Sequence, residues 1–239
     1  MKPPSGLSRR AALIGLTAST TGLVGSGSTT AEAAPAGSEA GTCLVTPRSI
    51  EGPFYLDPRL VRADIDEGRP GTRLRMRMRV IEAGPCTPIP GARVDVWHAD
   101  AQGLYSGYEG QGDRGRVSTV GQTFLRGTQF SDDSGWAVFE TIYPGWYPGR
   151  ATHVHFKVLI EARTLLTGQM YFPDAVNASV YAGVPAYGGR ALKRDTLNAS
   201  DFLARREDPQ GRGVCTVVRS GDGYVASLAI GVDRGKTLR

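Results

Sequence analysis

The feature that most constrains the fold is a strict alternation of apolar and basic residues over 73–80. Leu74, Met76, Met78 and Val80 take every second position, and arginines take the positions between them. Successive side chains of a β-strand point to opposite faces of the sheet. The segment therefore predicts a half-buried strand with an apolar inner face and a basic outer face.

Further short extended segments follow at regular spacing. They cover residues 92–98, 123–130, 136–142, 153–160 and 166–172, and a terminal hairpin covers 214–232. The 32 glycines and 15 prolines favour many turns over long helices. About eight strands with hardly any helical period predict an all-β fold, a single-domain β-sandwich of mostly antiparallel strands. Long loops such as 100–117 are expected to carry function.

The N-terminus is predicted to be an export signal, and the domain is expected to occupy 51–239. Arg9 and Arg10 precede a weakly apolar stretch, and Ala31-Glu32-Ala33 offers small residues at a cleavage site. The arginine pair is typical of a twin-arginine (Tat) signal over 1–33, with an ordinary secretory signal as the alternative. A flexible leader over 34–50 would follow. We expect an extracytoplasmic, secreted protein without a membrane span, because no other segment approaches the ~20 apolar residues of a span.

Charge and cysteine content exclude several classes of function. The formal net charge of +5 is spread along the chain without a basic run, so we expect no nucleic-acid partner. Cys43, Cys86 and Cys215 are too widely spaced for a cysteine-built metal site. In an oxidising compartment one pair is expected to form a disulfide and the third cysteine to remain free. The spacing leaves the choice of pair open.

Two histidines and two tyrosines form the strongest chemical signal. His153 and His155 are two of only three histidines, and one strand face would carry both. Neutral imidazole is the commonest metal ligand. Tyr105 and Tyr147 add phenols, which bind metal well only as phenolates, and a hard, acidic cation such as Fe(III) can enforce that ionisation. This ligand set favours ferric iron, although each residue alone is also compatible with polar packing at a sandwich edge.

Longer motifs resemble the intradiol ring-cleavage dioxygenases. Residues 94–105 resemble the first ligand segment of that family, with the sequence VDVWHADAQGLY. Residues 141–156 resemble the second, with the sequence TIYPGWYPGRATHVHF. Residues 51–54 and 169–172 fit flanking motifs of the same family. The resemblance extends over about 43–205.

The resemblance implies an activity and a cofactor. A non-haem Fe(III) would be held by Tyr105, Tyr147, His153 and His155. A small-molecule catechol would bind through both oxygens and be cleaved by O₂ to a cis,cis-muconate-type product, so the protein would be an oxidoreductase that incorporates both oxygen atoms. The diol would displace Tyr147, which then accepts a proton and so acts as a catalytic residue.

Two further residues receive roles from the resemblance. Arg150 would stabilise charge that develops on the ring, as a catalytic and substrate-binding residue, and Gln169 would be a polar residue beside the substrate. The segment between Tyr147 and His153 is shorter than in some relatives. We also expect the chain to lack the helical N-terminal region that catechol 1,2-dioxygenases use to dimerise. The particular catechol therefore does not carry over, and a homo-oligomer is compatible with the sequence.

Two other functions fit part of the pattern. The first is a zinc hydrolase that uses His98, His153 and His155, although His98 shares a strand face with valines and is interpreted as a packed histidine. The second is a non-catalytic sandwich that binds an aromatic ligand or polymer. Its binding residues would be Tyr105, Tyr108, Trp146 and Tyr147.

Overall fold

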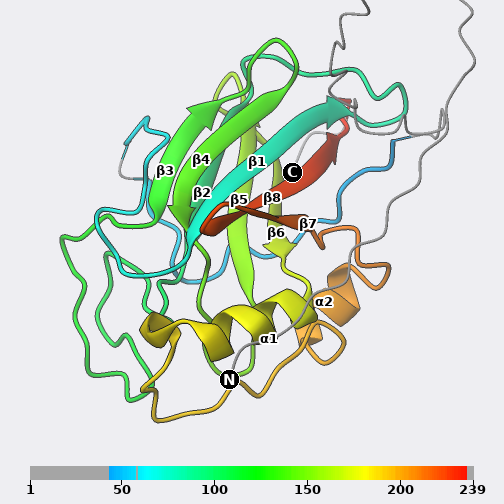
Figure 1. The fold of residues 1–239 in the computed structure, drawn as a ribbon. Helices are drawn as coiled ribbons and strands as arrows, with labels where there is room; N and C mark the ends of the chain where they lie inside the picture. The colour runs from blue at the N-terminus through cyan, green and yellow to red at the C-terminus, as the bar shows by residue number, and fades with distance from the viewer. Residues whose placement is uncertain (1–42, 58, 236–239) are drawn as a thin grey trace, which may run out of the picture. The chain divides into compact units, whose positions relative to one another are not determined.

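Eight β-strands and two α-helices make up the part of the chain that the computed structural model describes, residues 43–57 and 59–235 (Figure 1). The strands are β1 (Arg73–Glu82), β2 (Arg93–His98), β3 (Arg126–Phe130), β4 (Trp136–Ile142), β5 (His153–Ile160), β6 (Arg163–Tyr171), β7 (Thr216–Ser220) and β8 (Gly223–Val232). The helices are α1 (Asp174–Gly183) and α2 (Phe202–Glu207), with a 3₁₀ turn, η1 (Pro185–Tyr187), between them. The predicted signal over 1–33 and the leader up to residue 42 lie outside the described residues.

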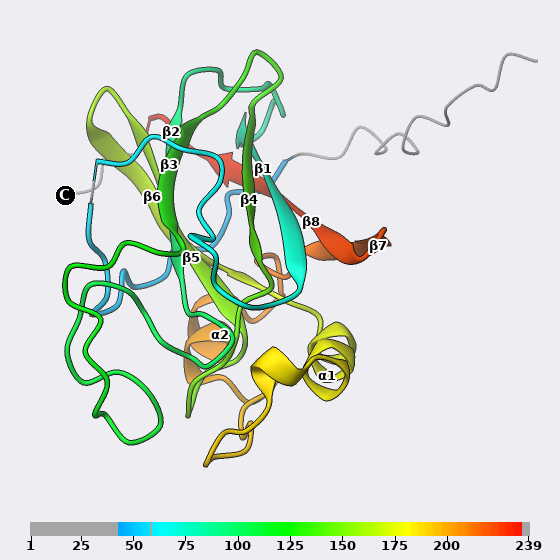
Figure 2. The same ribbon diagram turned by 60° about the vertical axis from the view of Figure 1, so that its left-hand side comes forward.

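The strands form two four-stranded sheets that face each other, as Figure 2 shows. Their orders are β4-β1-β8-β7 and β3-β2-β5-β6. Within the described chain every strand pairing is antiparallel except β1 with β8. The predicted all-β sandwich is confirmed.

The alternation in β1 builds the interface between the sheets. Leu74, Met76 and Met78 are at most 1% exposed, whereas Arg73 and Arg75 are exposed on the outer face. Burial of each such apolar side chain stabilises the fold by roughly 1.5–3 kcal/mol. The same core cluster includes inward side chains of the second sheet: Val94, Val96, Val154, Phe156 and Val158.

The sequence analysis did not predict the two helices. Only Asn177 and Val180 are buried in α1, so the helix presents no continuous apolar stripe that a period of 3.6 residues could reveal. The six residues of α2 are too few to show a helical period. Two strands begin at other residues than predicted: β3 begins at Arg126 and not at 123, and β6 begins at Arg163 and not at 166.

One end of the sandwich gathers the segments that carry the chemical motifs. Strand β2 ends where β5 begins and β6 ends, since His98 pairs with Val154 and His153 pairs with Tyr171. The 99–125 loop leaves this end. Figures 1 and 2 both place α1 and α2 beyond the same end of the sheets.

The cysteines pair in one way. Cys43 and Cys86 form a disulfide, which ties the first described residue to the loop after β1, and Cys215 is free and buried. The expected disulfide with one cysteine left over is confirmed, and the structure identifies the pair. No helix among the described residues has the length and apolar character to cross a bilayer.

Candidate active site

The two histidines at the start of β5 point at a common position. His153 and His155 are each 2% exposed, and their Nε2 atoms lie 3.1 Å apart. His153 Nδ1 lies 2.7 Å from the Ala151 carbonyl oxygen, which can only accept, so Nδ1 carries the proton and Nε2 presents a lone pair. The His155 ring stacks on Trp97 with centroids 5.0 Å apart, and its buried Nδ1 has no hydrogen-bond partner within residues 43–57 and 59–235.

Both predicted tyrosines reach the same position from loops. The Tyr147 hydroxyl lies 3.1 Å from His153 Nε2. The Tyr105 ring meets Tyr147 and His155 edge to face, with centroids 5.7 and 6.0 Å away. Tyr105 is 1% exposed, and among the described residues its buried hydroxyl makes no hydrogen bond of good geometry, although the neighbouring Tyr147 contributes to its raised pKa. The fold thus brings the side chains of Tyr105, Tyr147, His153 and His155 together.

A metal ion fits this arrangement of donor atoms. Two nitrogens bound to one metal at about 2.1 Å and at roughly a right angle would lie about 3 Å apart, close to the separation between His153 and His155. The buried Tyr105 hydroxyl, whose ring meets that of Tyr147, would gain a cationic partner. Two oxygens and two nitrogens without a thiolate favour a hard or borderline cation such as iron.

Burial governs the protonation of these groups. It holds the pKa values of His153 and His155 well below the ordinary histidine value, and the neighbouring positive charge of Arg150 adds to this effect. It raises the pKa values of Tyr105 and Tyr147 above the ordinary tyrosine value. The imidazoles are therefore neutral and able to ligate, and the phenols need a nearby cation to ionise.

The zinc alternative is not favoured by the geometry. His98 is packed as predicted, at 1% exposure, and burial lowers its pKa to about 4. Its Nδ1 lies 2.9 Å from the Ala99 oxygen, and its Nε2 lies 2.9 Å from the Thr141 hydroxyl, so both ring nitrogens are engaged. Across residues 43–57 and 59–235 no three histidine, cysteine or acidic side chains form a metal-binding group.

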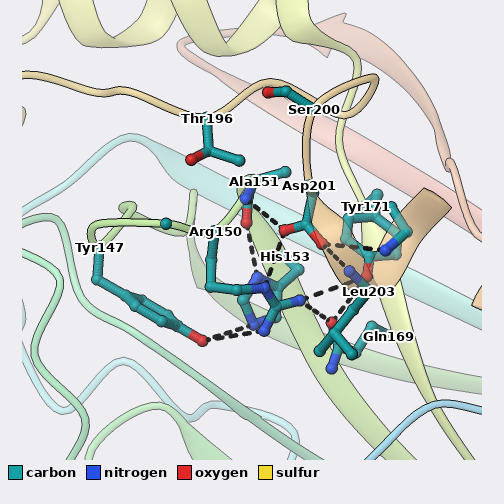
Figure 3. Close-up of polar contacts among 12 residues, drawn as sticks. Tyr147, Arg150, Ala151, His153, Gln169, Tyr171, Thr196, Ser200, Asp201 and Leu203 are labelled. Carbon is teal, nitrogen blue, oxygen red and sulfur yellow. Dashed lines mark hydrogen bonds and ion pairs between the residues drawn. The ribbon is translucent and has the colours of Figure 1, made fainter. Parts of the chain in front are cut away.

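Arg150 is held beside Tyr147 by a buried polar network (Figure 3). Its Nε donates to Asp201 Oδ2 at 2.9 Å, and its Nη1 lies 3.4 Å from the Tyr147 hydroxyl. Its Nη2 contacts Gln169 Oε1, and the Tyr171 hydroxyl donates to the same oxygen at 2.9 Å. The predicted Arg150 and Gln169 therefore share one network next to the four converging side chains.

Asp201 belongs to this network and was missed by the sequence analysis. It is fully buried, and Oδ2 accepts from Arg150 and, at 2.7 Å, from the Ala151 amide. Oδ1 accepts from the amides of Leu203 and Ala204 at 2.9 and 3.0 Å, which makes Asp201 the N-cap of α2. An aspartate directly before a helix is a known capping signal, but here the helix itself had escaped notice.

The 51–54 segment packs against the site from the β2 side. The Phe54 ring stacks on Tyr105 with centroids 4.7 Å apart. A Cβ atom on Gly52, whose φ is +75°, would come within 3.2 Å of His155 Cε1. Arg126, which is buried, donates to the Phe54 carbonyl at 2.6 Å. These contacts hold Tyr105 and His155 in place.

A pocket of about 170 Å³ opens onto Tyr105 and Tyr147. It is smaller than the roughly 300–1,000 Å³ of sites for drug-sized ligands, which suits a single substituted ring. Tyr108 and Trp146, which the aromatic-binding alternative requires, do not line it. The Tyr108 hydroxyl donates to the Tyr55 carbonyl at 2.6 Å, and Trp146 is 5% exposed.

Comparisons with known proteins agree with this picture. A family model described as "Dioxygenase" matches residues 50–180. The chain is similar to an intradiol ring-cleavage dioxygenase from Tetranychus urticae, with 27% identity, a TM-score of 0.74, and coverage of 82% of this chain and 98% of that one. It is also similar to the dioxygenase domain of a dioxygenase carbohydrate-binding protein fusion from Streptomyces sp. SirexAA-E, with 28% identity, a TM-score of 0.58, and coverage of 79% and 98%.

Among curated proteins, the chain is similar to catechol 1,2-dioxygenase from Acinetobacter baylyi. The two are 29% identical over 149 residues, which cover 52% of this chain and 45% of the relative. The chain thus spans about half the length of the curated relatives it matches.

Proposed function

Because the chain belongs to the intradiol ring-cleavage dioxygenase family, we propose that it uses O₂ to cleave a catechol-type diol between its two hydroxyl-bearing carbons. The product would be a cis,cis-muconate-type diacid that contains both oxygen atoms. The observation that supports this proposal most strongly is the convergence of two phenols and two imidazoles beside a pocket of one-ring size. Homologues named catechol, chlorocatechol and hydroxyquinol 1,2-dioxygenase support the same reaction class.

The residues that would hold ferric iron are Tyr105, Tyr147, His153 and His155. When bound, Fe(III) acts as a Lewis acid and template that makes the coordinated diol reactive toward O₂. The protein keeps the two imidazoles rigid, because they project from a paired strand and Trp97 stacks on His155. Loops supply the two phenols, and the stacked Phe54 ring holds Tyr105 in its buried position.

Tyr147 and Arg150 would handle protons and charge. The Tyr147 oxygen, at the edge of the pocket, would take up a diol proton when the substrate replaces it. The Arg150 guanidinium lies within 3.4 Å of that oxygen and would stabilise negative charge on the ring. Asp201 and Gln169 fix the guanidinium beforehand, so little reorganisation is needed during the reaction.

The decisive experiment measures oxygen uptake with a panel of catechols, together with iron content and a visible spectrum on the same sample. We expect one O₂ consumed per catechol, an absorbance of a muconate-type product, and a reddish protein from tyrosinate-to-iron charge transfer. Tyr147→Phe should lose most of this activity, while Tyr224→Phe on β8, outside the pocket, should keep it. A colourless protein that contains zinc or no metal and consumes no oxygen would reject the proposal.

We also propose that the mature protein works outside the cytoplasm. The Arg9-Arg10 pair and the Cys43–Cys86 disulfide support export, since disulfides persist in oxidising compartments. When the full-length chain is expressed and the cells are fractionated, we expect the mature protein in the extracytoplasmic fraction. The double substitution Arg9→Lys and Arg10→Lys should hold it in the cytoplasm. A wild-type protein that stays cytoplasmic with both cysteines reduced would contradict export.

A further inference from the structure

The pocket beside Tyr105 and Tyr147 has two charged residues in its wall, Asp113 and Arg190. They form an ion pair: Arg190 Nη2 contacts Asp113 Oδ1, and Arg190 Nε lies 3.5 Å from Oδ2. The Arg190 side chain is only 4% exposed and the Asp113 side chain 10%. The remaining lining is aromatic, glycine-rich or uncharged, so these two groups set the charge that a ring substituent would meet.

The pair is fixed by three chain segments. The Arg190 guanidinium lies 3.7 Å from the centroid of the Trp146 ring, and its Nη1 donates to the Trp146 carbonyl. The Leu192 amide donates to Asp113 at 3.3 Å. A Cβ atom on Gly103 would lie 2.4 Å from the Trp146 oxygen and 3.1 Å from Arg190, so only glycine leaves room for this packing. The opposite charges therefore stay together in the wall.

We propose that the Asp113–Arg190 pair makes the pocket select catechols whose ring substituents carry no charge. This inference rests on the proposed function and specifies its substrate class. An anionic substituent would lose hydration in the pocket and gain little, because Asp113 repels it where Arg190 attracts it. The other guanidinium of the site, Arg150, is likewise paired, with Asp201. Uncharged substituents avoid this desolvation cost.

The test compares kcat/KM for 4-methylcatechol with kcat/KM for 3,4-dihydroxybenzoate, which differ in charge at the same ring position. The wild type should favour 4-methylcatechol by about tenfold or more. Asp113→Asn leaves Arg190 unpaired and should shift the ratio about tenfold toward the carboxylated substrate. Arg190→Gln leaves Asp113 unpaired and should shift it the other way. The double variant should restore the wild-type ratio.

Controls separate this proposal from general damage and from failure of the proposed function. Asp133→Asn, in the exposed turn before β4, should leave the ratio unchanged. Should a single variant not fold, Pro148→Lys adds a cation to the pocket wall and should shift the ratio toward 3,4-dihydroxybenzoate relative to Pro148→Gln. Dissociation constants of 4-methylcatechol and 3,4-dihydroxybenzoate, measured by tryptophan fluorescence without oxygen, compare the two ligands in the absence of turnover.

The outcomes are distinct. A protein that consumes no catechol contradicts the proposed function, while the dissociation constants still test the charge rule. A wild type that prefers 3,4-dihydroxybenzoate overturns the inference and leaves ring cleavage intact. The inference is also overturned if the ratio of the two kcat/KM values is equal in the wild type and in all the charge variants.

Discussion

Replacing His155 with alanine is expected to remove ring cleavage and bound iron together. His155 lies near the start of β5, between the paired strands β2 and β6, and presents Nε2 to the same position as His153, so its loss removes one of the four proposed ligands. Loss of a group that merely hydrogen-bonds a metal ligand costs roughly 10–100-fold in affinity or activity, and loss of a ligand should cost more than that. Iron content, visible charge-transfer absorbance and oxygen uptake measure the effect.

The matched control is His98→Gln. Both ring nitrogens of His98 are engaged by protein oxygens, and its side chain is equally buried. We expect this variant to lose stability but to bind iron and turn over substrate normally once folded. If His155→Ala instead kept a full complement of iron, or if His98→Gln emptied the site, the proposed ligand set would be wrong.

The sandwich could be predicted from the sequence because short extended segments recur at regular spacing and one of them, β1, alternates apolar and basic residues. In β1 the apolar side chains alternate with arginines that remain outside, so both faces are visible in the sequence. The helices α1 and α2 gave no comparable signal. Their positions depend on tertiary packing, as when Tyr143 donates to Asn177 at 2.7 Å across 34 residues.

The same distinction applies to the site. His153 and His155 could be found because residues two positions apart in a strand point to the same face. Tyr105 and Tyr147 required recognition of longer motifs. Asp201 and Tyr171 depend on contacts that spacing does not encode: Asp201 meets Arg150 across 51 residues, and strand register sets Tyr171 beside His153.

The cysteine pairing shows why spacing alone left alternatives open. Cys43 joins Cys86 because the chain before β1 returns to the loop that follows it, where Cys43 bridges Gly84. Cys215 instead lies in the core cluster, with Met170 and Phe172 among its members. This pairing follows from the way β1 and the terminal hairpin pack. The spacing of the cysteines in the sequence does not determine it.

Replacing Asp201 with alanine is expected to destabilise the fold by about 3–5 kcal/mol, because it leaves the Arg150 guanidinium buried without its counter-charge. The loss includes the N-cap of α2, for which about 1 kcal/mol is typical. Asp201→Asn can keep the oxygen that caps α2, but its amide NH2 then replaces the oxygen that accepts from Arg150 and Ala151. This variant should retain the cap, lose the counter-charge and lower kcat through a misplaced Arg150. Denaturant unfolding and substrate kinetics measure the two effects separately.

Asp132→Ala supplies the control for lost backbone hydrogen bonds. Asp132 accepts from the amides of Ser134 and Trp136 at 2.9 and 2.8 Å in an exposed turn. Its loss should cost about 1 kcal/mol and leave kcat unchanged. If Asp201→Ala were no more destabilising than Asp132→Ala, the buried ion pair would contribute nothing to the fold. If Asp201→Asn kept the wild-type kcat, Asp201 would not position Arg150, and the link from α2 to the proposed chemistry would fail.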